Sequence, residues 1–239
     1  MDMPQASFIV PTLNEEKYLQ ACLSSIVDQK TCVDYELIVA DGGSTDKTVT
    51  IAERYADKVI CLNRKGIWLG RNKGASRARG QLLLFIDADT SIPRNYLEVT
   101  QGVMQDNQIS ALSNAFRFDK RGRLVEMAQD VVNNYLLAKS LAGIGEILGF
   151  NAVIGRTTFA KVGGFPDAPL DDAAIAKKLR KVGRLAYLLE PKVTTSYRRL
   201  ERSGMIMTVV YYASLGLVTD IPSIPTKKVM PFRDYIPFR

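Results

Sequence analysis

The 239-residue sequence contains no histidine and only three cysteines. The absence of histidine excludes Ser-His-Asp and Cys-His nucleophilic chemistry and argues against a typical zinc site. Cys22, Cys32 and Cys61 are odd in number and lack metal-type spacing, which argues against a disulfide framework and for a reducing compartment. We expect each of them to fill apolar space. Acid–base chemistry must then use carboxylates, Lys or Tyr.

The sequence also lacks the features of a secretory signal and contains no internal repeats. Its first residues carry no basic region, and the apolar stretch that follows is interrupted at Pro11. A chain of this length with 46% hydrophobic residues can form one substantial core and a small appendage. We therefore expect a catalytic domain over residues 1–200 and a distinct tail over residues 201–239.

The net charge of +7 is concentrated in one segment rather than spread along the chain. Its basic residues are Lys177, Lys178, Arg180, Lys181, Arg184, Lys192, Arg198, Arg199 and Arg202, opposed by Glu190 and Glu201. Such a face can meet an anionic membrane, a nucleic acid or a diphosphate, or can simply be solvated. Because no aromatic residues are interleaved among residues 177–184, we expect no nucleic-acid binding.

Apolar runs alternate with segments of helical period through the first half of the chain. The runs are Ser7–Leu13, Glu36–Ala40, Lys58–Leu62 and Gln81–Ile86. This alternation predicts an α/β fold with a Rossmann-like, mostly parallel sheet flanked by helices. We expect Asn14 to cap the first helix, and Ser44 or Thr45 to cap the second.

The pattern changes from residue 109 onward, so we divide the domain into halves at 1–108 and 109–200. Residues 110–118 are typical of a strand, residues 124–143 of a long, largely apolar helix, and residues 149–155 of another strand. We expect this second half to build the pocket of a second substrate. Asp172 precedes a helical stripe of Ile175 and Leu179, so it should lie at a helix N-terminus, where the dipole favours a carboxylate.

Polar motifs follow three of the predicted strands at the point where each strand ends. Asp87 and Asp89 end the fourth strand, and as i and i+2 residues they share a face that could hold one divalent cation. Residues 11–15 follow the first strand, and residues 41–44 follow the second. The carboxyl edge of a parallel sheet is where ligands bind. The three loops together predict a metal–diphosphate site.

Several ordered motifs resemble those of the family 2 glycosyltransferases of GT-A fold, over roughly residues 6–195. They are residues 10–15, 39–46, 70–75 and 85–89, followed by Gly163-Gly164-Phe165 and an acidic pair before a helix. The resemblance implies inverting transfer of a hexose from a nucleotide sugar, GDP-mannose or a UDP-sugar, with Mg²⁺ or Mn²⁺ as cofactor. One departure is Asp171-Asp172, where the family usually has Glu-Asp.

The resemblance also assigns roles to individual residues. On the donor side, Pro11, Thr12 and Glu15 would border the nucleotide, and Asp41 would bind the base. Arg71 would help to hold the base or the diphosphate, and Ala88 would contact the donor. Asp87 would contact the ribose or the metal, and Asp89 would be the principal metal ligand. Asp172 would be the catalytic base. Asn151, Asp171, Arg198 and Arg199 would meet the acceptor or the diphosphate.

Residues 204–219 carry no charge and are strongly apolar. In a helix they would span about 24 Å, less than the roughly 30 Å of a hydrocarbon core, so we favour an interfacial helix over a span through residues 204–225. Burial against the domain is the alternative. Basic residues on both sides suit anionic headgroups. We therefore expect a membrane-associated protein on the cytoplasmic face.

The basic flank and apolar tail resemble, more weakly, those of dolichyl-phosphate-mannose-synthase-like and cellulose-synthase-like relatives. This implies a lipid-linked acceptor such as a polyprenyl phosphate or a diphosphate-sugar. The Gln-x-x-Arg-Trp signature of processive enzymes is absent, which favours one transfer per encounter. Two alternatives stay open: a soluble glycosyltransferase with a non-lipid acceptor, and a sugar nucleotidyltransferase, although the Gly-rich loop expected of the latter after the first strand is missing.

Overall fold

The computed structural model describes residues 3–168 and 170–203. The chain divides into two compact units, Met1–Thr195 and Ser196–Arg239. The predicted division into a catalytic domain over residues 1–200 and a tail over residues 201–239 stays a prediction. Most of the predicted tail, residues 204–239, lies outside the described residues, and so does its expected association with a membrane. Within the described ranges, no helix has both the length and the apolar character needed to cross a bilayer.

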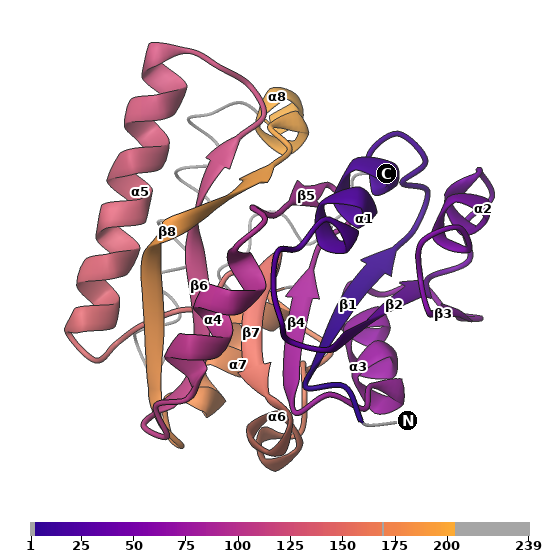
Figure 1. The fold of residues 1–239 in the computed structure, drawn as a ribbon. Coiled ribbons are helices and arrows are strands. Elements are labelled where there is room, and N and C mark those ends of the chain that lie inside the picture. Colours follow the sequence, from indigo (N-terminus) through magenta and orange to yellow (C-terminus); the bar gives the residue numbers. More distant parts are fainter. Residues whose placement is uncertain (1–2, 169, 204–239) are drawn as a thin grey trace. The chain divides into compact units, whose positions relative to one another are not determined.

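One eight-stranded mixed sheet runs through the whole first unit, in the order β3-β2-β1-β4-β7-β6-β8-β5 (Figure 1). The strands are β1 (Ala6–Thr12), β2 (Tyr35–Asp41), β3 (Lys58–Cys61), β4 (Leu82–Ile86), β5 (Thr90–Ser91), β6 (Ile109–Phe118), β7 (Asn151–Gly155) and β8 (Arg184–Thr195). β1 to β4 are parallel, whereas β7 runs antiparallel to both of its neighbours, β4 and β6. Strands β4 and β6 therefore end at the same edge, and the predicted mixed α/β sheet is confirmed.

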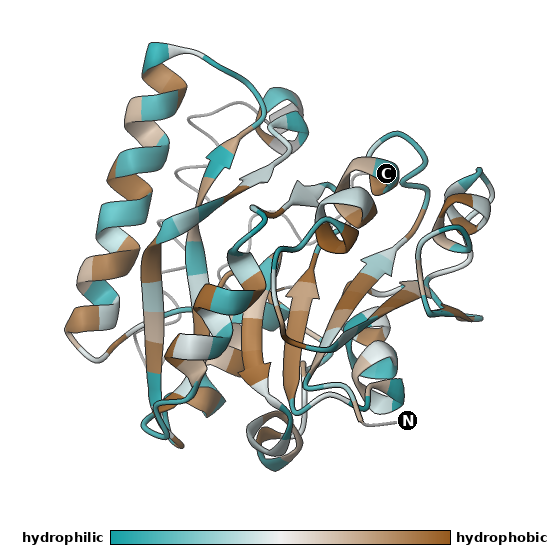
Figure 2. Cartoon of the chain, viewed as in Figure 1, coloured by the Kyte–Doolittle hydropathy of each residue, from teal (hydrophilic) through white to brown (hydrophobic). Residues whose placement is uncertain are grey.

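Helices cover both faces of this sheet. Their bounds are α1 (Leu19–Val27), α2 (Thr48–Ala52), α3 (Ile67–Arg77), α4 (Tyr96–Met104), α5 (Arg123–Leu141), α6 (Arg156–Val162) and α7 (Asp171–Leu179), with α8 (Arg198–Ser203) in the second unit. Apolar residues of α1, α2 and α4 pack on one face, and those of α3, α6 and α7 on the other. The central strands are brown in Figure 2 because both of their faces are buried.

Helix α3 lies unusually close to β1 because it carries glycine where the two elements meet. A Cβ atom at Gly74 would stand 2.4 Å from Cγ2 of Ile9, and one at Gly70 would stand 3.0 Å from Cβ of Pro11. Real Cβ atoms do not approach other atoms so closely, so glycine is required at Gly74. This close packing brings Arg71, which lies between the two glycines, against the end of the sheet.

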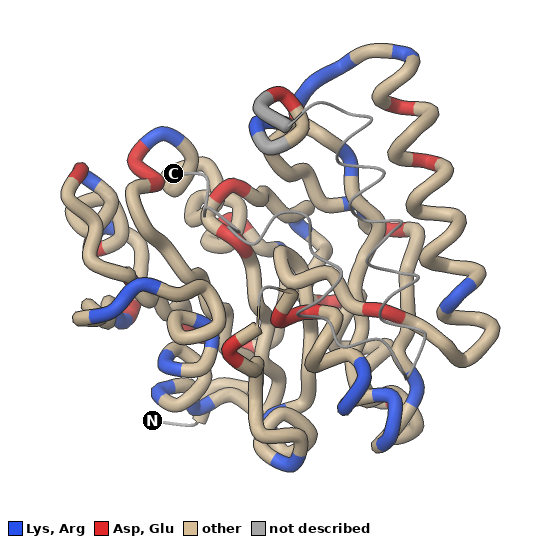
Figure 3. Tube along the Cα trace, turned by 180° about the vertical axis from the view of Figure 1, so that it is seen from behind, with Lys and Arg blue, Asp and Glu red and all other residues tan. Residues whose placement is uncertain are grey.

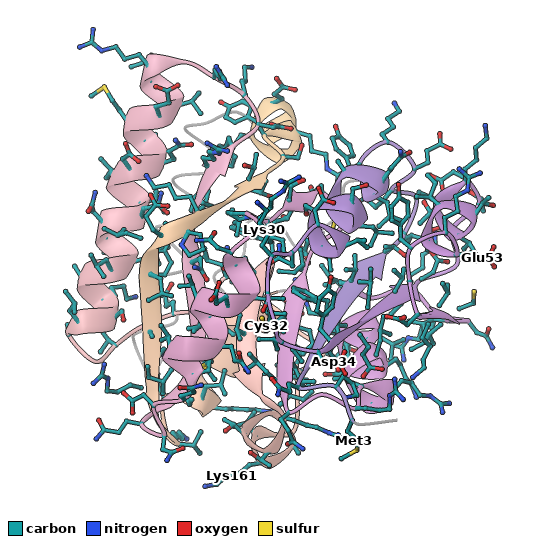
Figure 4. The ribbon with its side chains drawn as sticks, viewed as in Figure 1. Met3, Lys30, Cys32, Asp34, Glu53 and Lys161 are labelled. Carbon is teal, nitrogen blue, oxygen red and sulfur yellow. The ribbon has the colours of Figure 1, made fainter. Side chains whose placement is uncertain are left out.

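The predicted helix caps are wrong. Helix α1 begins at Leu19, and Asn14 adopts a left-handed conformation (φ 53°) in the loop before it. Helix α2 begins at Thr48, whose backbone N–H donates to Asp46 rather than to Ser44 or Thr45. The loop residues are instead used to bind the two loops together. The expectation for the cysteines holds only for Cys22, because Cys32 and Cys61 are exposed; Cys32 lies in the connection between α1 and β2 (Figure 4).

The long helix α5 is present where it was predicted, but it turns polar residues toward the sheet and apolar residues outward. Its buried residues include Gln129 and Asn133, whereas Leu124, Met127 and Val131 are exposed. Brown and teal bands therefore alternate along its length in Figure 2. The helix still covers the end of the sheet, where Leu136 packs with Ala115 and Tyr187.

Candidate active site

The loop after β2 is organised by the carboxylate of Asp41, which is 1% exposed. It accepts hydrogen bonds from the backbone N–H groups of Gly43 (2.9 Å) and Ser44 (2.8 Å), and from the hydroxyls of Ser44 and Thr12. Gly43 has a φ of +90°, which favours glycine. Asp41 thus fixes the turn, and any contact with a nucleotide base would have to share these oxygens.

The loops after β1 and β2 are joined by hydrogen bonds between residues far apart in the sequence. The backbone N–H of Asn14 donates to the hydroxyl of Ser44, and the Asn14 side chain accepts from the backbone N–H of Thr45. The backbone N–H of Glu15 donates to the hydroxyl of Thr48. The two loops predicted to border the nucleotide therefore form one rigid edge.

Arg71, on α3, connects two carboxylates that come from different parts of the chain. Its Nη2 lies 2.9 Å from Oδ1 of Asp87, just after β4, and its Nη1 lies 2.7 Å from Oδ2 of Asp171, in the first turn of α7. The guanidinium is buried, with 3% of the side chain exposed. Arg71 thereby holds the start of α7 against the end of β4.

The surroundings of Arg71 preserve its charge despite burial. Burial opposes a charged guanidinium, but Asp171, Asp87 and Asp172 together raise the pKa of Arg71 above its ordinary value. The guanidinium also lies over the ring of Phe165, 5.0 Å from its centroid. The guanidinium is therefore enclosed and paired with two carboxylates, and its role in holding the base or diphosphate stays a prediction.

The space around Arg71 is formed by residues to which sequence reasoning gave no role. A Cβ atom at Gly149 would stand 2.7 Å from Nη2 of Arg71, so only glycine leaves room for the guanidinium. The amide of Asn72 donates to the carbonyl of Phe165 (2.7 Å) and accepts from its N–H (3.0 Å). The motifs around residues 70–75 and 163–165 were visible in the sequence, but their contact with each other was not.

The neighbouring residues Asp171 and Asp172 have different environments. Asp171 is buried and paired with Arg71. Burial raises the pKa of its carboxyl, and the nearby Asp172 and Asp87 carboxylates raise it further, whereas Arg71 lowers it. Asp172 is partly exposed and accepts from the N–H of Gly149 (3.3 Å) and of Ala173 (2.8 Å). Asp171 therefore anchors α7, and Asp172 is the member of the pair that a substrate can reach.

Asp87 and Asp89 emerge after β4, as predicted, with Ala88 buried between them. Burial, and after it the carboxylates of Asp89, Asp87 and Glu15, raise the pKa of the Cys22 thiol. Within residues 3–168 and 170–203, however, no three acidic or sulfur side chains are close enough to bind a metal by themselves. A hard cation needs at least six oxygens, so two carboxylates fit a metal whose shell a bound diphosphate completes.

The family model for glycosyl transferase family 2 matches residues 7–161. The chain belongs to this family. The match begins in β1, contains every donor-side motif described above and ends in α6, which confirms the assignment that the ordered motifs predicted. The acidic pair at the start of α7 lies just beyond it.

Curated glycosyltransferases are similar to this chain over less than half of its length. A PGL/p-HBAD biosynthesis glycosyltransferase of Mycobacterium bovis is 43% identical over 98 residues, which are 38% of each chain. The poly(ribitol-phosphate) β-N-acetylglucosaminyltransferase TarS of Staphylococcus aureus is 33% identical over 119 residues, 46% of this chain and 20% of TarS. The matched region thus spans well under half the length of either relative.

Solved structures of glycosyl-transferring enzymes share the fold over most of this chain. A mannosyltransferase of Pyrobaculum calidifontis, solved with GDP-Man and Mn²⁺, superposes with a TM-score of 0.71 at 22% identity, covering 91% of this chain and 65% of its own. Glucosyl-3-phosphoglycerate synthase of Mycobacterium tuberculosis, solved with Mn²⁺ and UDP, gives 0.62 at 20% identity over 89% and 79%. The expected GT-A fold is thereby confirmed.

The acceptor-side residues named from the sequence have different surroundings in the structure. Asn151 is fully buried, and its amide is hydrogen-bonded to the backbone N–H and C=O of Asn114, while its contact with the acceptor or diphosphate stays a prediction. Arg198 and Arg199 lie in α8, in the second unit, and their contact with the acceptor stays a prediction. Pro11 and Thr12 are buried at the end of β1.

Proposed function

We propose that this protein transfers a sugar from a nucleotide-sugar donor to an acceptor hydroxyl with inversion at the anomeric carbon. The observation that carries the proposal is the buried bridge from Asp87 through Arg71 to Asp171. It holds Asp87, after β4 on the donor side, to the start of α7, where the partly exposed carboxylate of Asp172 follows Asp171. A donor and a base must be adjacent for a single displacement to occur.

The donor half of the site suits a nucleoside diphosphate with a divalent cation, Mg²⁺ or Mn²⁺. Asp89, with Asp87, would hold the cation, which when bound neutralises charge that develops on the departing diphosphate. Asp87 is kept in place by Arg71. The loops joined through Asp41 and Asn14 would receive the nucleotide, with Pro11, Thr12 and Glu15 at its border, so that binding meets a preformed edge.

Asp172 is our candidate for the base that takes the acceptor proton. Its carboxylate is partly exposed, and it is positioned by the N–H of Gly149 and the helix start. As the acceptor oxygen attacks C1 from the face opposite the diphosphate, its proton passes to Asp172. No protein acid is needed for the leaving group, which departs as a diphosphate anion.

For the acceptor, we propose a lipid-linked molecule, with the protein on the cytoplasmic face of a membrane. The support comes from the sequence: the basic segment 177–202 and the uncharged residues 204–219 that follow it. The names of TarS and glucosyl-3-phosphoglycerate synthase indicate phosphate-bearing products in two relatives. A polyprenyl-phosphate acceptor and the products named for these relatives all carry phosphate. A soluble phosphorylated acceptor is therefore the alternative to test.

The experiment that tests the function compares Asp172→Asn with Asp171→Asn. Donor turnover would be measured with a panel of GDP- and UDP-sugars and Mn²⁺, and donor binding by calorimetry. We expect Asp172→Asn to lower turnover by at least about 10²-fold, the usual worth of a general base, with donor affinity within about twofold of wild type. Full turnover in this variant would remove Asp172 from the role.

Asp171→Asn serves as the matched control because it makes the same chemical change one residue away. It weakens the anchor of α7 at Arg71, so we expect a lower melting temperature and reduced turnover, with the pH profile of the wild type retained. In Asp172→Asn, by contrast, the melting temperature should change little while the acidic limb of the pH profile disappears. If neither variant nor wild type binds any nucleotide sugar, the proposed function is wrong.

A further inference from the structure

The outer face of α5 is a continuous apolar stripe. It consists of Leu124 (72% exposed), Met127 (57%), Val131 (69%) and Tyr135 (57%). Their spacing of three and four residues places them on one side of the helix, above one another. Two further exposed apolar residues are Leu141, the last residue of the helix, and Ile144, which follows it.

The inner face of α5 is polar for a structural reason. β6 pairs with β7 only over residues 111–113, which leaves the following backbone of β6 without a neighbouring strand on that side. Side-chain amides cover this edge at alternate residues: Asn151 at Asn114, Asn133 at Phe116, and Gln129 at Phe118. An uncovered strand edge would leave buried backbone groups without partners.

The outward stripe is therefore not explained by the fold. The contacts of α5 with the sheet depend on Gln129, Asn133 and Leu136, and the opposite side could be polar with no loss of those contacts. Large apolar side chains in a contiguous exposed row mark a surface that meets a partner. The partner must be apolar along the length of the helix.

The connection that leads into α5 adds a charge of one sign. Residues 117–123 contain four basic residues, Arg117, Lys120, Arg121 and Arg123, against one acidic residue, Asp119, and all five are exposed. Figure 3 shows this connection in blue above the first turns of α5. Of the acidic residues that follow, Asp130 is within 3.6 Å of the Lys192 ammonium. An apolar stripe beside a net positive turn complements an anionic lipid surface.

We propose that the outer face of α5 docks on the surface of an anionic lipid bilayer, with the stripe in the acyl boundary and residues 117–123 at the headgroups. The proposal deepens the proposed function and rests on it for the lipid-linked acceptor. Because β6 and β4 end at the same sheet edge, the basic end of α5 lies at the edge that carries Asp87 and Asp89. A bilayer bound there presents its headgroups at the reaction edge.

The test uses the full 239-residue chain and vesicles of phosphatidylcholine with phosphatidylglycerol. A Met127→Glu, Val131→Glu variant should bind these vesicles at least about tenfold more weakly in sedimentation, because two apolar side chains are lost from the contact. Val27→Glu is the matched control, since Val27 is 51% exposed on α1. It should bind as well as wild type. High salt or pure phosphatidylcholine should weaken wild-type binding.

A second measurement reports contact at the stripe itself. In a background with the exposed Cys32 and Cys61 changed to Ser, an environment-sensitive dye would be attached to Val131→Cys, or to Glu53→Cys as the control. Glu53 is exposed on the other side of the first unit from α5 (Figure 4). Vesicles should shift the emission of the Val131 dye to the blue and leave the Glu53 dye unchanged.

The proposal is overturned if the wild-type chain ignores anionic vesicles, or if the charged α5 variant binds them unchanged, which would assign binding to another segment. It is also overturned if the variant changes a dimer into a monomer in light scattering without any effect on vesicles, which would make a second copy the occupant. Donor binding should be equal in all variants. Vesicle binding without donor binding would reject the proposed function and leave this inference intact.

Discussion

Two buried polar networks join distant parts of this chain, and they differ in charge. Around Arg71 the network is ionic and joins α3, β4 and α7. Along the free edge of β6 it is neutral and consists of the amides of Asn151, Asn133 and Gln129. A neutral amide satisfies a backbone edge without the desolvation penalty of a charge. The ionic network lies at the sheet edge where the proposed reaction needs carboxylates, so the comparison separates the candidate site from a structural network.

Arg71→Met gives the largest expected effect, because it removes the charge that Asp171 and Asp87 share. Loss of one partner of a buried ion pair typically destabilises by about 3–5 kcal/mol. Urea unfolding would measure this, and donor turnover should fall together with stability. Asp87 and the start of α7 would no longer be held together.

Arg77→Met is the control for this change, because Arg77 lies on the same helix and is exposed. It should unfold within about 0.5 kcal/mol of wild type. Combining Arg71→Met with Asp171→Asn should recover part of the stability without recovering turnover, since the buried charge is relieved but the bridge is still absent. An Arg71→Met protein as stable and as active as wild type would remove the distinction between the two networks.

Asn133→Ala tests the neutral network and should affect stability alone. It leaves the N–H and C=O of Phe116 and the hydroxyl of Tyr187 without their partner. Each unsatisfied buried group costs about 1–3 kcal/mol, so a total of a few kcal/mol is expected, reduced where water enters. Turnover measured well below the melting temperature should match that of wild type.

Asn134→Ala makes the same substitution at the next residue, which is exposed and bonded only within its own helix. Its stability should stay close to that of wild type. If Asn133→Ala lowered turnover at a temperature where it is fully folded, the neutral network along β6 would belong to the site after all, and the contrast with Arg71 would be lost.

Much of the ionic network could be predicted from the sequence, and little of the neutral one. The apolar run that ends in Asp87 and Asp89 predicts a strand buried on both faces, and it places the two carboxylates at the end of that strand. The pairing of Arg71 with Asp171 joins residues 100 positions apart, which local patterns do not encode. The neutral network is needed because β7 stops pairing with β6 at residue 113, and this pairing is a property of the assembled sheet.

The errors have the same origin. Asn14 has the chemistry of a helix cap, but a loop that lies next to it in space takes its side chain instead. The sequence predicts a long, largely apolar helix over residues 124–143, but it does not indicate which face of that helix is buried. The edge of β6 needed amides on that side, and this need is invisible until the sheet is built.

Glu36 gives the smallest and most specific test, because it is charged and buried but lies at the opposite edge of the sheet from Asp41. Burial alone would raise the pKa of its carboxyl, but hydrogen bonds from the backbone and guanidinium of Arg79 and from the Ser7 hydroxyl lower it below the ordinary 4.5. A lowered pKa means that its stabilising effect is present above the unfolded-state value and is lost as the pH falls through the folded-state value.

Glu36→Gln should therefore cost about 1 kcal/mol of unfolding free energy at pH 7 and less below pH 4, and it should leave turnover unchanged. Urea unfolding of both proteins across this range would measure the difference. A loss of the same size at every pH would mean that shape, rather than charge, is what Glu36 contributes. A loss of turnover would mean that a buried charge anywhere in this sheet affects the candidate site. The location of the Arg71 network at the carboxyl edge of the sheet would then no longer distinguish it from Glu36.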